Sequence, residues 1–230
     1  MTKFPFTIVF FDVDCCLLDT HTSERRILKE LYAQQGQQIA DETVLSYQSI
    51  NRTLWKYLDR GEITREELYL RRFRLLFEQY PHILPAEKVA PWFLDQLAHA
   101  YDPAPGAAHL LKRMKDAGAR IFTASNGIGA VMNGRVKNAG LSTYIDGCFA
   151  ADEVGAMKPS PAYFDYIFRH SGETDLSRTL MVGDNPVTDV NGAVEYGMTG
   201  ALLGHRWQSE SRASYSAPTV PDLEKFLFGD

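Results

Sequence analysis

Residues 8–14 read Ile8-Val9-Phe10-Phe11-Asp12-Val13-Asp14, an apolar run that ends in two carboxylates. The β-branched and aromatic residues predict a strand, and in α/β proteins the turn after a strand is where ligands bind. Two carboxylates at such a turn can hold a divalent cation, or can divide the duties of nucleophile and acid/base. This turn is therefore the first candidate for a catalytic site.

Further apolar runs predict more strands, and from residue 105 onward they alternate with helical patterns. The predicted strands cover residues 6–11, 120–123, 147–150, 179–182 and 200–203. The intervening helices begin near Pro105-Gly106, Gly127, Ser160-Pro161 and Asn185-Pro186, and proline suits the first turn of a helix. This alternation predicts an α/β fold with a doubly wound, mainly parallel, Rossmann-like sheet.

The stretch between the first two strands is far too long for a simple crossover, and its pattern is helical. Apolar residues recur at helical spacing, as at Val44, Tyr47, Leu54 and Leu58. The sequence Thr64-Arg65-Glu66-Glu67 fits a capping box, which marks the start of a helix. The stretch therefore predicts a small helical bundle whose aromatic residues form its core.

The position of this bundle suggests how the chain is divided. We predict a catalytic core made of residues 1–19 and 102–230, and a helical cap domain at residues 20–101. Because the insert follows the Asp12/Asp14 turn directly, it is placed to cover the site. We expect it to open and close about linkers near residues 19–21 and 99–104.

The bulk composition is that of an ordinary globular protein. The 230 residues are 45% hydrophobic and 23% charged, and the formal net charge of -5 argues against a nucleic-acid polymer as the main partner. We expect no membrane association, because no apolar run approaches spanning length. Three cysteines at 15, 16 and 148 form no disulfide framework or zinc spacing, so we expect the reducing environment of the cytoplasm. We expect a monomer or a homodimer. Residues 209–216 are polar and predict a loop.

Four separate segments place polar side chains at strand ends or in the loops that follow strands. They are Asp12 with Asp14, Ser125-Asn126-Gly127, Lys158-Pro159, and the run from Gly183 to Asp189 that contains Asp184. Because the carboxyl ends of parallel strands meet at one edge of a sheet, we expect these segments to line one crevice. Together they supply four carboxylates, one ammonium, one hydroxyl and the N–H groups of a helix start.

This set of groups predicts a metal ion and a phosphate. Clustered carboxylates repel one another unless a cation lies among them, and Mg²⁺ suits a site with oxygen ligands and few protein contacts. The lysine, the hydroxyl and the helix N-terminus then suit a phosphate group. Each motif is weak by itself, since Ser-Asn-Gly and Gly-Asp are ordinary turn sequences. Their order and shared placement make the set informative.

With these motifs in this order, the sequence resembles the haloacid dehalogenase-like hydrolases over essentially its whole length. The resemblance is carried by Asp12-Val13-Asp14, Ser125, Lys158, and Gly183-Asp184 with Asp189. The helical insert resembles the type-1 cap of that family. Within the insert, Ile50-Asn51-Arg52-Thr53-Leu54-Trp55, Gly61-Glu62-Ile63-Thr64 and Arg72-Phe73 resemble the branch of pyrimidine 5′-nucleotidases.

The resemblance implies a role for each carboxylate at the site. Asp12 attacks the phosphorus and forms an aspartyl-phosphate. Asp14 protonates the leaving oxygen and later takes a proton from the attacking water. Mg²⁺ is held by the Asp12 carboxylate, the Asp14 main-chain carbonyl and Asp184.

The remaining matched residues are implied to act on the phosphoryl group. Ser125 and the Asn126 N–H bind phosphoryl oxygens. Lys158 neutralises charge on the phosphoryl group and on Asp12, and Asp189 orients Lys158 or a metal-bound water. Catalysis of this kind is mainly positioning and electrostatic stabilisation.

Two positions bear on the reaction type and its efficiency. Dehalogenases of the family lack a carboxylate at the position of Asp14, so its presence favours an oxygen leaving group that needs a proton. Cys15 and Cys16 depart from the family pattern, which favours threonine at position 16, and a thiol is a poorer donor than a hydroxyl. Three interpretations stay open: tolerated substitutions, reduced efficiency, or a redox role such as a vicinal disulfide.

We therefore expect a Mg²⁺-dependent phosphomonoesterase for a small phosphorylated metabolite, with a pyrimidine nucleoside 5′-monophosphate as the favoured substrate. The first alternative is a phosphatase for a sugar phosphate or another small metabolite such as phosphoglycolate. The second is a catalytically weakened member that binds a ligand or a partner. Phosphoryl transfer to an acceptor other than water is a further alternative.

Overall fold

The computed structural model describes residues 4–204 and 210–229. The chain divides into two compact units, one made of Met1–Thr20 with Ala100–Asp230 and the other of His21–His99. The chain passes from one unit to the other between Thr20 and His21 and again between His99 and Ala100. Each unit is described by itself.

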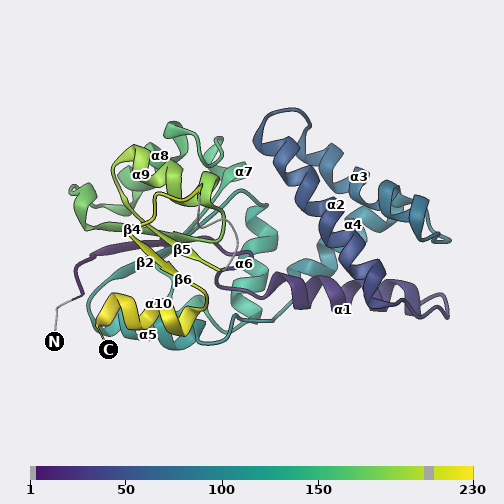
Figure 1. Cartoon of the computed structure of the whole chain (residues 1–230), viewed down its shortest axis with the longest axis horizontal. Coiled ribbons are helices and arrows are strands. Elements are labelled where there is room, and N and C mark those ends of the chain that lie inside the picture. The colour runs from purple at the N-terminus through teal and green to yellow at the C-terminus, as the bar shows by residue number, and fades with distance from the viewer. Residues whose placement is uncertain (1–3, 205–209, 230) are drawn as a thin grey trace. The chain divides into compact units, whose positions relative to one another are not determined.

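A six-stranded parallel sheet organises the first unit (Figure 1). Its strands are β1 (Ile8–Phe11), β2 (Arg120–Ser125), β3 (Gly147–Ala150), β4 (Thr179–Gly183), β5 (Thr199–Leu203) and β6 (Tyr215–Ala217). The strand order is β3-β2-β1-β4-β5-β6, and every neighbouring pair is parallel. The chain runs from β1 to one edge and then returns to the other side of β1, so the switch point lies between β1 and β4. The predicted α/β fold class is confirmed.

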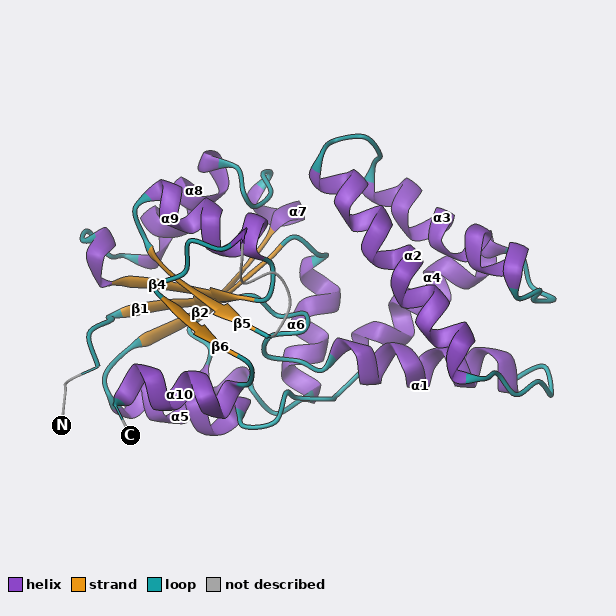
Figure 2. Ribbon diagram, in the orientation of Figure 1, coloured by secondary structure: helices purple, strands orange, loops and turns teal. Residues whose placement is uncertain are grey.

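Helices cover both faces of this sheet (Figure 2). One face packs on α5 (Ala107–Asp116), α6 (Gly129–Asn138) and α10 (Val220–Phe228), and the other on α7 (Ala151–Val154), α8 (Pro161–Ser171) and α9 (Gly192–Tyr196). Strand β1 supplies Val9 and Phe11 to the first core and Ile8 and Phe10 to the second. Burial on both sides explains why this strand is apolar without alternation.

The polar stretch at residues 209–216 differs in part from its predicted loop. Residue 209 lies outside the described residues, and Tyr215–Ala217 form the edge strand β6, paired with Ala201–Leu203 of β5. Ser216 is exposed and Ala217 is buried, so the strand shows only one short alternation. A three-residue edge strand has too weak a pattern to be recognised, because its formation depends on pairing with β5.

The second unit is the helical bundle that the sequence predicts between the first two strands. Its helices are α2 (Asp41–Asp59), α3 (Arg65–Gln79), α4 (Ala86–Ala98) and most of α1 (Thr20–Ala33). The rings of Tyr47, Phe73 and Phe93 meet in its core, with centroids 5.1 to 5.6 Å apart. The Thr64 hydroxyl accepts a hydrogen bond from the Glu67 N–H at 3.2 Å, so the predicted cap of α3 is present.

A buried cation lies in the core of the bundle. Arg72 is only 3% exposed, and its guanidinium carbon lies 5.0 to 5.8 Å from the centroids of four aromatic rings. Its Nη1 donates to Oδ1 of Asn51 at 3.5 Å. These two residues belong to the segments that resemble the nucleotidase branch, and the fold brings them into contact.

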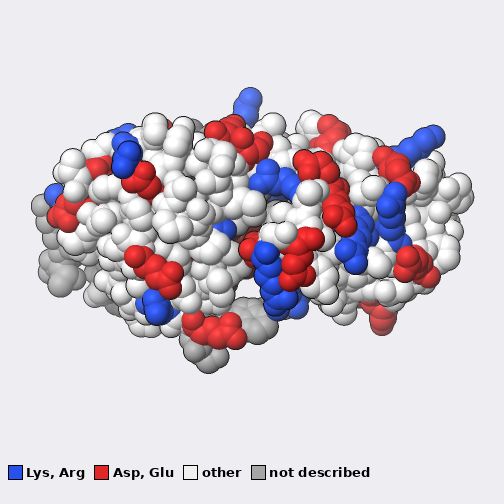
Figure 3. Space-filling model, turned by 90° about the horizontal axis from the view of Figure 1, so that it is seen from above, with Lys and Arg blue, Asp and Glu red and all other residues white. Residues whose placement is uncertain are grey.

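Acidic and basic side chains are interspersed on the face of the molecule shown in Figure 3. A mixed surface produces local attraction and repulsion rather than an extended field of one sign. Within the described residues, every helix falls short of the length and apolarity that are needed to span a bilayer.

Candidate active site

The sheet brings three of the predicted site residues to its carboxyl edge. Asp12 directly follows β1, and its N–H donates to the Val182 carbonyl at 2.8 Å, which extends the pairing of β1 with β4. Asp184 directly follows β4, and Ser125 is the last residue of β2. Because β2 and β4 flank β1, these side chains come from three adjacent strands.

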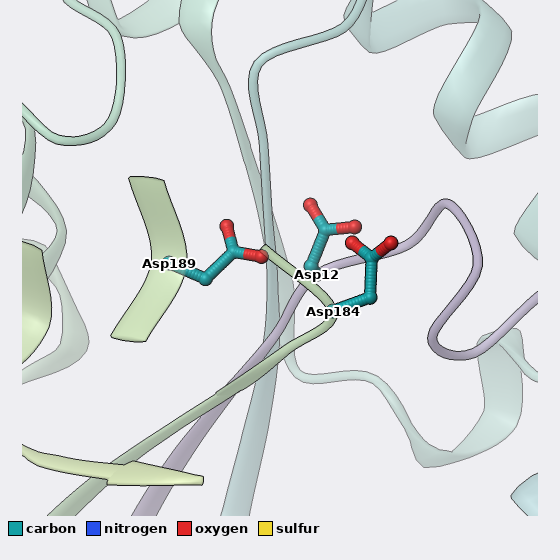
Figure 4. A group of neighbouring side chains, drawn as sticks. All are labelled: Asp12, Asp184 and Asp189. Carbon is teal, nitrogen blue, oxygen red and sulfur yellow. The ribbon is translucent and has the colours of Figure 1, made fainter. Parts of the chain in front are cut away.

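Three carboxylates lie close together at this edge (Figure 4). Asp12, Asp184 and Asp189 each offer an oxygen, and these oxygens all lie within 4.8 Å of one another. Burial raises the pKa of Asp12 to about 7, with Asp189 and Asp14 adding to the rise and Lys158 opposing it. Burial, Asp12 and Asp189 also raise the pKa of Asp184 well above its ordinary value. Such a cluster favours the binding of protons or a cation, and its oxygen donors fit a hard divalent ion.

Lys158 provides the positive charge inside this cluster. Its Nζ donates to Oδ1 of Asp12 at 2.7 Å and to the Ala124 carbonyl at 2.6 Å, and lies 2.7 Å from Oδ1 of Asp189. The three ammonium protons therefore have three acceptors. Burial alone would lower the pKa of Lys158, but Asp12 and Asp189 raise it well above its ordinary value. The side chain thus remains a cation, although it is only 1% exposed.

Asn126 positions Lys158 through a contact that the sequence does not reveal. Its side-chain Oδ1 accepts from the Lys158 N–H at 2.8 Å, and its Nδ2 donates to the Lys158 carbonyl at 2.9 Å. The motif pattern points only to the Asn126 N–H, as a phosphate donor. The neighbouring Ser125 is buried, and its hydroxyl oxygen accepts from the Gly127 N–H at 3.0 Å.

Asp189 lies in an irregular helical turn. The helix predicted from Asn185-Pro186 to Gly197 begins as the π-helical segment η3 (Pro186–Asn191) and continues as α9. Turns of this kind are frequent at functional sites. Oδ2 of Asp189 accepts from the Asn185 N–H at 3.0 Å, while Oδ1 faces Lys158. Both carboxylate oxygens are thus engaged, which fits orientation of Lys158 better than metal ligation.

Gly183 is needed where Asp189 packs on the end of β4. A Cβ on Gly183 would lie 2.5 Å from the Cβ of Asp189, and closer still to its carboxylate. We expect Gly183→Ala to destabilise the protein by about 1–3 kcal/mol, because Asp189 must move away from Lys158. Urea unfolding measures this effect. The matched control is Gly147→Ala in β3, whose added methyl meets only the Phe122 ring at 3.1 Å; equal losses in the two variants would contradict the prediction.

The Asp14 side chain is turned toward a buried arginine instead of the carboxylate cluster. Its Oδ1 accepts from the Thr20 hydroxyl at 2.8 Å and pairs with Nη1 of Arg135. Partial burial tends to raise the pKa of Asp14, but Arg135 and Thr20 hold it below its ordinary value. Arg135 lies on α6 and was not singled out from the sequence, because one arginine in a predicted helix carries no signal of its own.

The two cysteines after Asp14 have different environments. Cys15 has a φ of 55° and is the one non-glycine residue with positive φ in the described part of the chain. It therefore adopts a conformation that glycine would adopt without strain. Cys16 is buried, and its Sγ contacts the Val182 carbonyl at 3.8 Å. Burial and Asp12 raise the pKa of Cys16, which keeps it a poorly reactive thiol and argues against a redox role.

Comparison with known proteins supports the family resemblance independently of the site geometry. The model of the haloacid dehalogenase-like hydrolase family matches residues 6–197. The chain is 31% identical to the pyrimidine 5′-nucleotidase YjjG of Escherichia coli (strain K12), over 95% of this chain and 96% of YjjG. It is 28% identical to the pyrimidine 5′-nucleotidase PynA of Streptococcus pneumoniae (strain ATCC BAA-255 / R6), over 98% of this chain and 93% of PynA.

A solved structure shows the same fold. The HAD-hydrolase YfnB of Bacillus subtilis, in a crystal form bound to magnesium, superposes with a TM-score of 0.87. The match covers 97% of this chain and 99% of YfnB at 22% sequence identity. At this identity the likeness concerns the fold alone.

Proposed function

The chain belongs to the haloacid dehalogenase-like hydrolases, as its four motifs predict, and from this premise we propose that it hydrolyses phosphomonoesters. The observation that carries the proposal is the Lys158 ammonium between two buried carboxylates, Asp12 and Asp189. A cation at this point keeps Asp12 available as an anionic nucleophile. The half-exposed Asp14 lies two residues further on, where an acid and base is needed.

The proposed reaction has two steps. In the first, an oxygen of Asp12 bonds to phosphorus, the bond from phosphorus to the ester oxygen breaks, and a proton moves from Asp14 to that oxygen. Because Arg135 and Thr20 keep Asp14 ionised in the free protein, Asp14 takes up this proton from the bound phosphate monoanion or from water before the bond breaks. In the second, a water oxygen bonds to phosphorus, its proton moves to Asp14, and the bond to Asp12 breaks. The products are an alcohol and inorganic phosphate.

The other residues of the site hold the phosphoryl group. Among the described residues the Ser125 hydroxyl proton has no acceptor, so it can donate to a phosphoryl oxygen. In this proposal the Asn126 N–H contributes a second donor to the phosphoryl group. Lys158 offsets the negative charge that develops on the phosphoryl group during its transfer, and Asp189 keeps Lys158 oriented.

The donor set fits Mg²⁺. Asp12, Asp184 and the Asp14 main-chain carbonyl would hold the ion, and Asp184 has no hydrogen-bond donor among the described residues. When bound, Mg²⁺ supplies positive charge that offsets the repulsion between Asp12 and an incoming phosphate.

A pyrimidine nucleoside 5′-monophosphate is the substrate that we favour. Its support is the similarity to YjjG and PynA, together with the segments of the helical unit that resemble the nucleotidase branch. We take this helical unit to act as the cap domain and to select the substrate. Asp14 supports ester hydrolysis over dehalogenation, because a halide leaves without a proton.

A panel of phosphate esters tests the substrate class. We expect kcat/KM for UMP, dUMP or dTMP to exceed that for phosphoglycolate and sugar phosphates by about 10-fold or more, a difference of roughly 1.4 kcal/mol in transition-state binding. Equal rates would reject the nucleotidase assignment and leave the phosphatase standing. Absence of hydrolysis of any ester, including an aryl phosphate with Mg²⁺ present, would favour the binding-protein alternative. Chloride release from 2-chloropropionate would favour a dehalogenase.

Removal of the metal is expected to stop hydrolysis and to lower stability. A ligand at a hundred times its Kd stabilises the folded state by about 2.7 kcal/mol, so saturating Mg²⁺ should raise the unfolding midpoint by about 5–10 °C. Calorimetry with EDTA and then with Mg²⁺ measures this shift. The shift should be lost in Asp184→Asn and kept in Glu195→Gln, whose carboxylate lies on the surface. An equal shift in both variants would contradict the assigned ligands.

A further inference from the structure

We propose that Arg135 is a positioning residue for the acid/base step and that it makes Oδ2 of Asp14 the oxygen that exchanges the proton. This inference rests on the phosphatase function proposed above. Arg135 is not part of the four motifs that carry the family resemblance. It acts through the orientation of the Asp14 carboxylate.

The guanidinium of Arg135 makes its hydrogen bonds to two neighbouring side chains, Asp14 and Thr20. Its side chain is 2% exposed, with Nη1 on Oδ1 of Asp14 and Nη2 donating to the Thr20 hydroxyl at 3.0 Å. The Thr20 hydroxyl in turn donates to the same Oδ1 of Asp14 at 2.8 Å. Arg135, Thr20 and Asp14 therefore form a closed triangle of hydrogen bonds, with all three residues in the α/β unit.

The hydroxyl of Thr20 has no freedom left in this arrangement. It accepts from the Cys15 N–H at 3.2 Å and from Arg135, so its single proton is committed to Asp14. A hydroxyl has one proton and two acceptor positions, and all three are used. The direction of the bond to Asp14 is thus set by Arg135 and by the backbone of the catalytic turn.

These bonds differentiate the two oxygens of Asp14. Oδ1 accepts from two donors, whereas Oδ2 has no hydrogen-bond partner in the described residues. The side chain is 45% exposed although Arg135 is buried, so Oδ2 is the oxygen that a substrate or water can reach. When the ester bond breaks, the bond from Oδ2 to its proton breaks and a bond from that proton to the ester oxygen forms. A carboxylate fixed at Oδ1 presents Oδ2 in one direction at each turnover.

The dependence on the leaving group separates this role from a merely structural one. An alkyl ester needs a proton on its leaving oxygen, whereas 4-nitrophenolate leaves without one. In Arg135→Gln we expect the first turnover of the alkyl ester UMP to slow by about 100-fold, on the scale of general acid catalysis. The first turnover of 4-nitrophenyl phosphate should change by less than about 3-fold. The second step also uses Asp14, so the variant should release one equivalent of 4-nitrophenol in a burst and then turn over slowly.

Three variants support this measurement. Arg135→Lys, which can restore one contact to Oδ1, should recover part of the alkyl ester rate, and Thr20→Val should show the same leaving-group dependence as Arg135→Gln. Arg113→Gln is the matched control, because it breaks a 2.8 Å ion pair with Glu224 in the same unit. It should leave the ratio of the two first-turnover rates unchanged.

A double-mutant cycle completes the test. If Arg135 acts through Asp14, then Arg135→Gln should cause no further loss with UMP in an Asp14→Asn background. Equal losses for both esters, no loss for either, or an added loss in the Asp14→Asn background would overturn the inference. Misfolding would reduce the fraction of active protein, and so the amplitude of the first turnover, equally for both esters. It would leave the ratio of their first-turnover rates unchanged. If the wild-type protein released nothing from either ester, the proposed function itself would fail.

Discussion

Replacing Asp12 with asparagine is expected to abolish ester hydrolysis and yet to stabilise the metal-free protein. The amide cannot form the aspartyl-phosphate, so we expect kcat to fall by a factor on the order of 10⁵, as when other enzymes lose a covalent nucleophile. The substitution keeps the shape of the side chain and an oxygen that can accept from Lys158. The loss of activity should therefore not come from misfolding.

The gain in stability follows from the pKa of Asp12. Without metal, burial raises this pKa from 3.8 to about 7, so the folded protein binds a proton at pH values where the unfolded chain has released it. Stability from this group is complete below about pH 4 and is lost as the pH rises through about 7. Asparagine carries no charge at any of these pH values. The metal-free variant should therefore unfold at a higher temperature than the wild type near pH 8, and the difference should close toward pH 4.

Calorimetry in EDTA at several pH values measures this difference. At about pH 8 we expect the unfolding midpoint of Asp12→Asn to exceed that of the wild type by at least about 3 °C, roughly 1 kcal/mol for a chain of this size. Addition of Mg²⁺ should reverse the order, because the ion needs the Asp12 carboxylate. The control Asp165→Asn removes a surface carboxylate that pairs with Arg169, and it should shift the midpoint by less than about 1 °C. A fall in the midpoint of metal-free Asp12→Asn near pH 8 would show that Asp12 is a stabilising anion even without metal.

The parts of the fold that follow from local patterns were predictable. Strands β1 to β5 are short runs rich in apolar residues, fully buried in β1 and β4 and partly so in β3, and Gly or Pro marks the helix ends, so the local sequence pattern locates them. Strand β6 was missed because its three residues acquire their structure from the neighbouring β5. The π-helical form of η3 was also missed, since Pro186 predicts the start of a helix and not the number of residues in its turns.

In the site, too, residues at strand ends were predictable, whereas side-chain contacts that depend on packing were not. Asp12 and Asp184 directly follow β1 and β4, so the topology of a parallel sheet was enough to bring them together. Lys158 was predicted in a loop after a strand, but it lies between α7 and α8, where Asn126 hydrogen-bonds to its backbone. Arg135 lies in mid-helix, and its contact with Asp14 depends on how α6 packs on the sheet. The two hydrogen bonds between the Asn126 side chain and the Lys158 backbone likewise depend on how two loops meet. Neither contact leaves a pattern in one sequence.

Replacing Lys158 with methionine is expected to cause the largest loss of stability. Methionine has a similar length and no charge, so Asp12 and Asp189 would be left buried without their counter-ion, and the Ala124 carbonyl without its donor. Breaking a buried ion pair from one side costs about 3–5 kcal/mol. We expect a loss of this size in metal-free urea unfolding, and hydrolysis should fall by about 10³-fold because charge on the phosphoryl group is no longer offset.

Two comparisons test whether the loss comes from the uncompensated charges. Lys115→Met removes a lysine that pairs with Asp146 at 2.8 Å in a partly exposed position, and we expect it to cost less than about 1 kcal/mol. Lys158→Met combined with Asp189→Asn removes one of the two carboxylates that lack a counter-ion, and it should recover part of the lost stability. Mg²⁺ should stabilise Lys158→Met more than the wild type, because the ion then supplies the positive charge that Asp12 lacks. If Lys158→Met cost no more than Lys115→Met, or if Asp189→Asn made it worse, Lys158 would not be the counter-ion of the cluster, and the charge balance proposed for Asp12 would have to be abandoned.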